Sequence, residues 1–312
     1  MARVLVTGGA GFIGSHLVEA LLLQGERVRV LDDLSTGRRE HLAAVAGHPS
    51  LELVVGDLLD PERLRSEVQG VGVVFHQAAV RSVPRSVEDP WAAHEVNATG
   101  TLRLLLAARE AGVRRVVYAS SSSVYGHQET LPLHEEFRPA PLSPYAVSKL
   151  AGEHYCRVFA ALYGLETVGL RYFNVFGPRQ DPASRYAAVI PRFITAALRG
   201  EPLEVHGDGK QTRDFTYVSN VVEANLRAAT APGVSGAVFN VAGGERHSVL
   251  DLVRAFEELL GRELPVAHTP PRPGDVRDTQ ADVTRAREAL GLVPTVGFRD
   301  GLRRTLAAFQ AS

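Results

Sequence analysis

The first 172 residues repeat a pattern of short apolar runs that alternate with helix-like stretches. Apolar runs ended by glycine or polar residues are typical of buried strands, and apolar residues three and four positions apart, such as Leu17, Ala20 and Leu21, are typical of helices. The pattern predicts strands at 4–7, 27–31, 51–56, 71–76, 113–120 and 164–170 together with Tyr172. It predicts helices at 15–24, 61–68, 90–111 and 145–163. This order favours an α/β fold, a doubly wound parallel Rossmann sheet with helices on both faces.

Beyond residue 173 the strand and helix rhythm loosens. Residues 177–182 are rich in loop formers, and a proline cluster at 265–273 separates two helical stretches. The pattern predicts helices at 189–198, 248–260 and 284–290, a helix-bearing segment at 215–229, and strands at 203–205 and 238–241. We therefore expect one domain over 1–172, to which 214–242 returns, and a smaller α+β lobe made of 173–213 and 243–312.

Composition narrows the class of protein. The chain carries 34 basic and 35 acidic side chains, and this balance excludes a globally basic nucleic-acid binder. The single cysteine, Cys156, excludes a disulfide scaffold, a four-cysteine zinc site and a CxxC redox centre, and we expect no metal. No apolar run approaches the roughly 20 residues that span a bilayer, and a strand pattern begins near Arg3 with no apolar leader before it. We therefore expect a cytoplasmic protein that binds neither nucleic acid nor membrane.

A glycine-rich loop follows the first predicted strand and opens the first helix. Residues 8–14 read G-G-x-G-x-x-G. In this context glycines permit a tight turn and let backbone N–H groups approach a pyrophosphate. Asp32 ends the second strand, 18 residues after Gly14, where a carboxylate binds ribose hydroxyls and repels a 2′-phosphate. NAD is therefore favoured as the cofactor, although Arg38 and Arg39 leave NADP open.

Polar and small residues at the carboxyl ends of later strands extend this site. Asp57, after the third strand, suits hydrogen bonding to the edge of an adenine ring. Gln77, Ala78 and Ala79 end the fourth strand, where small side chains leave room for a cofactor across the sheet edge. The serines at 120–123 end the fifth strand at the same edge, and a hydroxyl there can share a proton with a substrate.

Tyr145 and Lys149 lie four residues apart in a helix that opens after Pro144, so both side chains share one helical face. An ammonium beside a phenol lowers the pKa of the phenol because positive charge favours the phenolate, which can then serve as a general base. Lys149 and Lys210 are the only lysines in this arginine-rich chain. Because arginine presents a planar fork in place of a compact ammonium, the lysine at 149 indicates a chemical role, whereas Lys210 sits in a turn typical of the surface.

Further motifs carry a resemblance to a known family. They are Leu170-Arg171-Tyr172-Phe173-Asn174-Val175-Phe176-Gly177, Thr212-Arg213-Asp214-Phe215 and Arg272-Pro273-Gly274-Asp275. With the loop at 7–14, Asp32, Ser121 and the Y-x-x-x-K at 145–149, they cover nearly the whole chain in order. The chain resembles the extended short-chain dehydrogenase/reductases of the NAD-dependent epimerase/dehydratase family, and within it the UDP-hexose 4-epimerases most of all.

The resemblance implies a catalytic triad of Ser121, Tyr145 and Lys149. In the implied reaction Tyr145, helped by Ser121, takes the proton of the C4 hydroxyl while hydride passes from C4 to bound NAD. The 4-keto sugar then turns about its diphosphate and receives hydride on the other face. The resemblance also implies a homodimer that pairs through the helices predicted at 90–111 and 145–163.

The same resemblance, with the residue patterns above, assigns the binding residues. The expected NAD contacts are Gly8, Gly11, Phe12, Ile13, Gly14, Asp32, Asp33, Asp57, Leu58, Gln77, Ala78, Ala79, Asn97, Tyr145, Lys149 and Tyr172. The expected contacts with a UDP-sugar substrate are Ser122, Ser123, Asn174, Val189, Val205, Arg213, Arg272, Asp275 and Thr279.

Some positions discriminate between reactions within the family. Where the family's 4,6-dehydratases carry Asp-Glu before Val-Tyr-Gly, this chain has Ser122 and Ser123, which leaves elimination without an acid and a base. A UDP-glucuronate decarboxylase or UDP-glucuronate epimerase is the alternative enzyme, although the decarboxylases usually carry a glutamate in that segment. Thr279 stands where a bulky tyrosine restricts the pocket, so we expect N-acetylhexosamine forms to be tolerated. A catalytically silent NAD-binding sensor is the alternative of another class, against which the intact triad argues.

Overall fold

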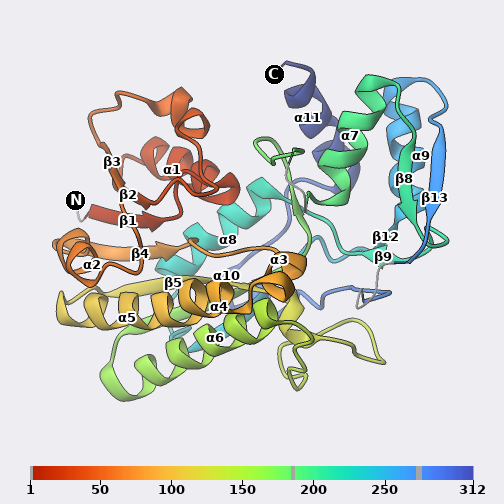
Figure 1. The fold of residues 1–312 in the computed structure, drawn as a ribbon. Helices are drawn as coiled ribbons and strands as arrows, with labels where there is room; N and C mark the ends of the chain where they lie inside the picture. Colours follow the sequence, from red (N-terminus) through yellow and green to blue (C-terminus); the bar gives the residue numbers. More distant parts are fainter. Residues whose placement is uncertain (1–2, 184–186, 272–275, 312) are drawn as a thin grey trace.

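A seven-stranded parallel sheet forms the centre of the molecule (Figure 1). The computed structural model describes residues 3–183, 187–271 and 276–311. The strands run across the sheet in the order β3 (Leu51–Val55), β2 (Arg27–Asp32), β1 (Arg3–Thr7), β4 (Val71–His76), β5 (Arg115–Ser121), β6 (Glu166–Tyr172) and β11 (Ala237–Val241). The strand order reverses between β1 and β4, and open α/β sheets bind ligands at such a switch point. The expected doubly wound Rossmann sheet is confirmed.

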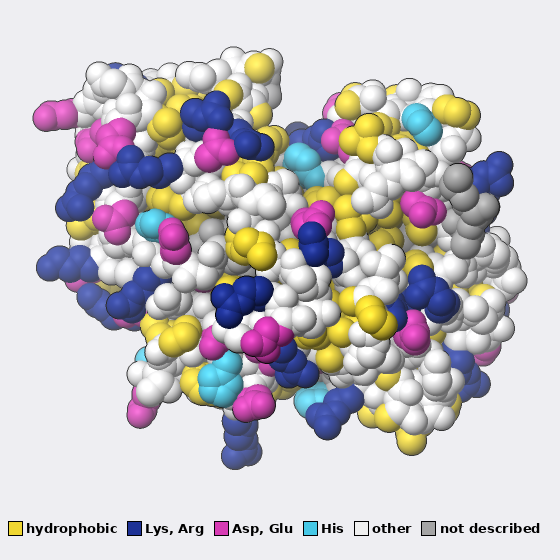
Figure 2. All heavy atoms as spheres, turned by 180° about the vertical axis from the view of Figure 1, so that it is seen from behind, with side chains coloured by type: hydrophobic (Ala, Val, Ile, Leu, Met, Phe, Trp, Pro, Cys, Tyr) yellow, Lys and Arg dark blue, Asp and Glu magenta, His cyan; other side chains and the backbone are white. Residues whose placement is uncertain are grey.

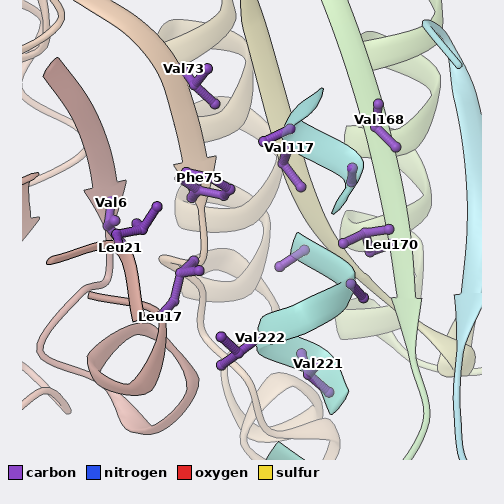
Figure 3. Packing of buried hydrophobic residues seen from close by; sticks show 14 of the residues in the cluster. Val6, Leu17, Leu21, Val73, Phe75, Val117, Val168, Leu170, Val221 and Val222 are labelled. Atoms are coloured by element: carbon purple, nitrogen blue, oxygen red, sulfur yellow. The ribbon is translucent and has the colours of Figure 1, made fainter. Parts of the chain in front are cut away.

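Helices cover both faces of the sheet. One face packs against α1 (Phe12–Leu23), α8 (Val218–Thr230) and α10 (Thr284–Leu290), and the other against α2 (Pro61–Glu67), α5 (Thr101–Glu110) and α6 (Pro144–Tyr163). Figure 3 shows Leu17 and Leu21 of α1 and Val221 of α8 among the side chains of the strands. Alternate strand residues point to opposite faces, and since helices cover both faces, most strand residues are apolar, although β2 carries Arg27 and Arg29 and the edge strand β3 carries Glu52.

A smaller lobe lies beside the sheet domain and has its own apolar core. Its helices are α7 (Val189–Arg199), α9 (Val249–Leu260) and α11 (Phe298–Gln310). The parallel strands β8 (Leu203–His206) and β13 (Val266–Thr269) complete it (Figure 1). Phe193, Leu252, Phe256 and Leu302 fill its centre and are essentially inaccessible to solvent.

Short elements complete the fold. They are η1 (Arg39–Val45), α3 (Val83–Glu88), α4 (Pro90–His94), the π-helical turn η2 (Glu95–Gly100) and η3 (Ser122–Tyr125), followed by the strand pairs β7 (Val175–Phe176) with β10 (Thr216–Tyr217) and β9 (Thr212–Arg213) with β12 (His247–Ser248). On the face seen in Figure 2, basic and acidic side chains are interspersed, as the balanced charge leads one to expect. Within the described residues, no helix has both the length and the apolar character that a membrane crossing requires.

Most predicted elements occur within a few residues of their expected positions, but the helix predicted over 90–111 is divided. Asp89 caps α4, and the π-helical turn η2 separates α4 from α5. Such a turn keeps the helix axis, so the spacing of apolar residues does not reveal it. The sequence prediction also omitted α3, α11 and β13. The last lies inside the proline cluster and is largely exposed, so no apolar run marks it.

Most of the segment 214–242 packs on the sheet domain, while Phe215, Tyr217 and Val218 at its start belong to the core of the smaller lobe. β11 pairs in parallel with β6, and α8 packs on the sheet face that α1 also covers. α10, from the segment assigned to the smaller lobe, also packs on this face through Ala286 and Leu290. The division of the chain at residue 172 stays a proposal.

Candidate active site

The glycine-rich loop between β1 and α1 makes a tight turn at the switch point. Gly8 has a φ of +69°, which glycine adopts without strain. A Cβ on Gly14 would lie 2.2 Å from the carbonyl oxygen of Gly8, so the helix can start this close to the loop only with glycine there. Gly11, which precedes α1, has no side chain that could cap the first N–H groups. The loop therefore presents backbone N–H groups at a helix N-terminus, an arrangement that binds phosphate oxygens.

The carboxylate of Asp32 ties the end of β2 to this loop. Its oxygens accept hydrogen bonds from the backbone N–H groups of Ala10 and Leu34, both at 2.9 Å. Burial raises the pKa of Asp32, and the two N–H donors oppose that rise. A Cβ on Gly37 would lie 2.6 Å from the carboxylate, so the chain after β2 folds closely around it. Asp32 thus shapes the loop as well as presenting a charge.

A cavity of about 480 Å³ lies along the carboxyl edge of the sheet at the switch point. Its walls include every expected NAD contact except Asn97, namely Gly8, Gly11, Phe12, Ile13, Gly14, Asp32, Asp33, Asp57, Leu58, Gln77, Ala78, Ala79, Tyr145, Lys149 and Tyr172. The phosphate-binding loop, the carboxylate after β2 and the small residues after β4 meet in one cavity, so these residues fit an NAD molecule. Their individual contacts with the cofactor stay a prediction.

Asn97 lies behind the cavity wall, in the π-helical turn. Its Oδ1 accepts a hydrogen bond from the N–H of Val80 at 2.8 Å, and its Nδ2 donates to the carbonyl of Val80 and to Ser148 Oγ, both at 3.0 Å. The side chain is 1% exposed. These bonds use both ends of the amide, so Asn97 supports the loop after β4 and the start of α6. Its expected contact with NAD is not seen among the cavity walls.

Helix α6 carries Tyr145 and Lys149 to the edge of the cavity. Ser143 caps the helix by accepting a hydrogen bond from the N–H of Ala146, and Pro144 takes the first helical position. Lys149 is 3% exposed, and its ammonium donates to the carbonyl oxygen of Ala119 at 2.8 Å. Burial lowers the pKa of Lys149 to about 7. The ammonium is therefore anchored to β5.

The charge environment of Tyr145 differs from the one expected. Burial raises the pKa of its phenol, while a hydrogen bond with Ser121 and the charge of Arg81 lower it. The cation that lowers this pKa is Arg81, and the effect expected of Lys149 stays a prediction. Lys149 points to the carbonyl of Ala119.

Arg81 and Arg179 at the cavity were missed, whereas Arg38 had been noted because it leaves NADP open. Arg81 follows Val80 on the loop after β4, and Arg38 bridges the cavity rim by an ion pair with Asp181 at 3.2 Å. Arg179 donates to Ser15 Oγ at 3.2 Å and so holds the 177–182 loop against α1. In an arginine-rich chain no local pattern distinguishes these side chains from solvated ones. These side chains reach the cavity because loops that are distant in the sequence lie next to one another in the fold.

The serines at the end of β5 make different hydrogen bonds. Ser121 accepts a hydrogen bond from the N–H of Ser123 at 3.2 Å and donates to Ser123 Oγ at 3.1 Å, which caps η3. Ser120 points the other way and donates to Glu153 Oε1 at 2.5 Å. The phenol of Tyr145 is hydrogen-bonded to Ser121, and Ser122 and Ser123 follow directly in η3, while the catalytic role of Ser121 stays a prediction.

Three of the expected substrate residues come together from distant segments. Thr279 donates its N–H to the carbonyl of Thr212 at 3.1 Å, which sets it beside Arg213. Asn174 Nδ2 donates to the carbonyl of Asp214 at 3.0 Å and lies 3.5 Å from Thr279 Oγ1. The guanidinium of Arg213 donates to the carbonyls of Thr212 and Arg277. Their role toward a substrate stays a prediction.

The remaining substrate residues are less closely grouped. Val205 lies in β8 and is wholly buried in the core of the smaller lobe, whereas Val189 begins α7 and is partly exposed. Arg272 and Asp275 lie outside the described residues.

Comparison with known proteins agrees with this arrangement. Residues 4–242 match the model of the NAD dependent epimerase/dehydratase family. The chain is 43% identical over 311 residues to a UDP-glucose 4-epimerase of Mycolicibacterium smegmatis, covering 99% of this chain and 98% of that protein. Among solved structures it resembles the Thermotoga maritima UDP-glucose 4-epimerase with UDP-glucose, at a TM-score of 0.94, 38% identity and 99% coverage of both chains.

A second solved structure is equally similar. It is the UDP-N-acetylglucosamine 4-epimerase from Methanobrevibacter ruminantium M1 in complex with UDP-N-acetylmuramic acid, at a TM-score of 0.95 and 39% identity, covering 99% of this chain and 98% of that one. The chain therefore belongs to the NAD-dependent epimerase/dehydratase family.

Proposed function

We propose that this protein is a UDP-hexose 4-epimerase that interconverts UDP-glucose and UDP-galactose with bound NAD. The observation that carries the proposal is the position of Tyr145 and Lys149 in the wall of the dinucleotide cavity, with Ser121 directly after the lining residue Ser120 on β5. The phenol is hydrogen-bonded to the serine, and the ammonium lies one helical turn further along α6. The relatives named above act on UDP-sugars, which supports the same substrate class here.

Each catalytic side chain has a separate task in this proposal. Bound NAD supplies the hydride acceptor and donor at the sugar C4. Tyr145 accepts the proton of the C4 hydroxyl, for which its buried phenol must first ionise, and the charge of Arg81 and the Ser121 hydroxyl favour that ionisation. Ser121 holds the substrate hydroxyl in line with the phenol. Lys149, anchored at Ala119, provides a compact positive charge for ribose hydroxyls.

The substrate lobe supplies the anchor about which the sugar turns. Arg213 suits a diphosphate, because its planar fork can bind paired oxygens. Asn174 and Thr279 lie within 3.5 Å of each other beside it and border the space for the sugar. We infer that the threonine leaves room for an N-acetyl group, so that UDP-N-acetylhexosamines are also accepted. Arg272 is proposed to complete the diphosphate site, and Asp275 to contact another part of the UDP-sugar.

The alternative within the family is an enzyme of UDP-glucuronate, a decarboxylase or an epimerase. Either enzyme needs a cation or hydroxyl groups that bind the carboxylate of the glucuronate. On the loop beyond Asn174 both Arg179 and Asp181 line the cavity, and Asp181 is paired with Arg38 at 3.2 Å, so these charges do not select against a carboxylate. We favour the neutral hexose because the relative of 43% identity is a UDP-glucose 4-epimerase.

The quaternary structure belongs to the same proposal. α5 and α6 lie side by side and carry exposed apolar side chains, of which Leu162 is 71% exposed and Val158 is 44% exposed. A second copy of the chain that covers this face would remove these side chains from water. We propose a homodimer paired through these helices, in the cytoplasm.

The deciding experiment incubates the purified protein with UDP-glucose, UDP-galactose, UDP-N-acetylgalactosamine and UDP-glucuronate separately. Proton NMR then identifies each product. We expect inversion at C4 of the two hexoses and of the acetylated sugar. Loss of CO2 from UDP-glucuronate with no hexose conversion would instead assign a decarboxylase, and no turnover of any sugar with NAD retained would favour a sensor.

A further inference from the structure

A buried carboxylate lies one helical turn beyond Lys149 on the catalytic helix. Tyr145, Lys149 and Glu153 follow at four-residue intervals, so they lie along one face of α6, which packs on β5 and β6. Glu153 is 8% exposed and, unlike Tyr145 and Lys149, is not among the described residues that line the NAD cavity. It is therefore placed to act on the catalytic groups from behind.

This carboxylate joins three elements. Its Oε1 accepts hydrogen bonds from Ser120 Oγ at 2.5 Å and Arg171 Nε at 2.9 Å, and its Oε2 accepts one from Arg171 Nη2 at 2.7 Å. Ser120 and Arg171 are directly paired across β5 and β6. The guanidinium of Arg171 also stacks over the ring of Tyr125, 4.6 Å from its centroid. The network ends at the strand position next to Ser121.

The network also carries charge in the interior. Lys149 and Arg171 are each 3% exposed, and Glu153 is the anion beside them. The other titratable groups around Lys149 are neutral near pH 7, because burial raises the pKa of the phenols and the thiol and lowers that of the imidazole to about 3: Tyr118, Tyr145, Cys156 and His76. Two buried cations therefore share one buried anion.

The protonation of Lys149 depends on that anion. Burial lowers the pKa of the ammonium, and the neighbouring Cys156 and Glu153 raise it. Since burial raises the pKa of the Cys156 thiol far above its usual range, the anionic group of the two is the carboxylate of Glu153, which is ion-paired with Arg171. Loss of this charge would leave Lys149 beside Arg171 with no anion between them.

We propose that Glu153 is a positioning residue of the reaction, whose buried carboxylate keeps Lys149 an ammonium and, through Ser120 and Arg171, holds the end of β5 that carries Ser121. The proposal rests on the epimerase function for its kinetic consequence only. Its electrostatic content concerns the folded chain with NAD bound and is open to direct measurement.

The test uses the fact that the chain has only two lysines. Lysine labelled with ¹³C at Cε gives signals from Lys149 and Lys210 alone. The Lys210→Arg variant removes one of the two signals and so assigns both. The Cε shift of the NAD-loaded protein is followed with pH. In Glu153→Gln, which keeps the shape of the side chain, we expect the pKa of Lys149 to fall by about one unit or more.

A second variant gives the opposite sign. Arg171→Met removes the competing cation and leaves Glu153 between Ser120 and Lys149, so the pKa of Lys149 should rise. This variant keeps the proposal testable if Glu153→Gln does not fold. The matched control is Glu166→Gln, because Glu166 pairs with Arg115 at 2.8 Å at the other end of the same two strands. It should leave the Lys149 signal unchanged.

The outcomes are decisive in both directions. A fall with Glu153→Gln and a rise with Arg171→Met support the proposal. An unchanged pKa in either folded variant, or an equal shift in Glu166→Gln, overturns it. In kinetics, Glu153→Gln should lower kcat and move the basic limb of the pH profile to lower pH, with little change in KM for the UDP-sugar. An inactive wild-type protein would end the epimerase proposal but leave the NMR titration valid.

Discussion

The imidazole of His76 donates from Nε2 to the hydroxyl of Thr101, 2.9 Å away. The direction follows from Thr101, whose own proton goes to the carbonyl of Asn97 at 2.6 Å, so its oxygen must accept. Nδ1 then accepts from Thr7 Oγ1 at 2.7 Å. His76 is 1% exposed at the end of β4, directly beneath the NAD cavity. The hydrogen bonds that join β1, β4 and α5 at the cofactor edge of the sheet thus require a neutral His76.

Acid should therefore destabilise the protein through His76. Burial lowers its pKa from 6.5 to about 3 in the folded chain, so between these values the unfolded chain binds a proton that the native state excludes. Its contribution to stability is complete above pH 6.5 and is lost as the pH falls toward 3. We expect urea unfolding of His76→Asn to depend less on pH over this window. His48→Asn, at an exposed position, should follow the wild type. Equal slopes in all three proteins would refute this.

Lys149→Arg should cripple turnover. A planar guanidinium is larger than the ammonium that binds the carbonyl of Ala119, so it does not fit this buried site. Its positive charge would then lie away from the position that the Lys149 ammonium occupies. We expect kcat to fall about 10²-fold or more, with the fold retained, as judged by circular dichroism. Lys210→Arg is the matched control, because Lys210 is exposed in a turn. Comparable activity of the two variants would remove the chemical role of Lys149.

Tyr145→Phe should remove the general base while keeping the protein folded. Only the phenol hydroxyl is lost, together with its hydrogen bond to Ser121. We expect kcat to fall by about 10²–10⁴-fold at unchanged NAD content, measured by absorbance after denaturation. Tyr163→Phe, at the half-exposed end of the same helix, should retain full turnover. A Tyr145→Phe protein of normal activity would place the proton transfer elsewhere.

Gly14→Ala should impair NAD binding and folding together. The added Cβ would meet the carbonyl oxygen of Gly8 at 2.2 Å and the Cα of Gly9 at 2.8 Å, and backbone atoms cannot move aside as a flexible side chain does. We expect a loss of about 1–3 kcal/mol in the free energy of unfolding and weaker retention of NAD on gel filtration. Gly297→Ala, with open space around the new Cβ, should behave as the wild type. Normal NAD content in Gly14→Ala would contradict the proposed cradle.

Leu162→Glu should separate the proposed dimer. A carboxylate at this exposed apolar position of α6 cannot be buried against a second copy without an unpaired charge. We expect sedimentation velocity at micromolar concentration to show a dimer for the wild type and a monomer for the variant. Leu23→Glu alters a side chain that is 89% exposed at the end of α1, and it should remain dimeric. A monomeric wild type would end the dimer proposal.

Local sequence was sufficient for the parts of the site that lie on single turns. The glycine loop, Asp32, the small residues after β4 and the Tyr145–Lys149 pair each depend on neighbours a few residues away. They line the cavity, apart from Gly9 and Ala10 of the loop. Asn97, the one expected NAD contact that is not in the cavity wall, lies in a π-helical turn, and its amide bonds to Val80 and Ser148.

The amino-acid sequence by itself predicted the doubly wound sheet and the cofactor class, because short-range periodicity and turn chemistry encode them, and its motifs carried the resemblance to the family. Only the tertiary structure decided the charges around the predicted catalytic residues. Arg81 reaches Tyr145 from another loop, Lys149 binds the carbonyl of Ala119, and Glu153 joins Ser120 to Arg171. These contacts connect side chains many residues apart, and the pKa of each group follows from burial and from the charges that folding brings beside it.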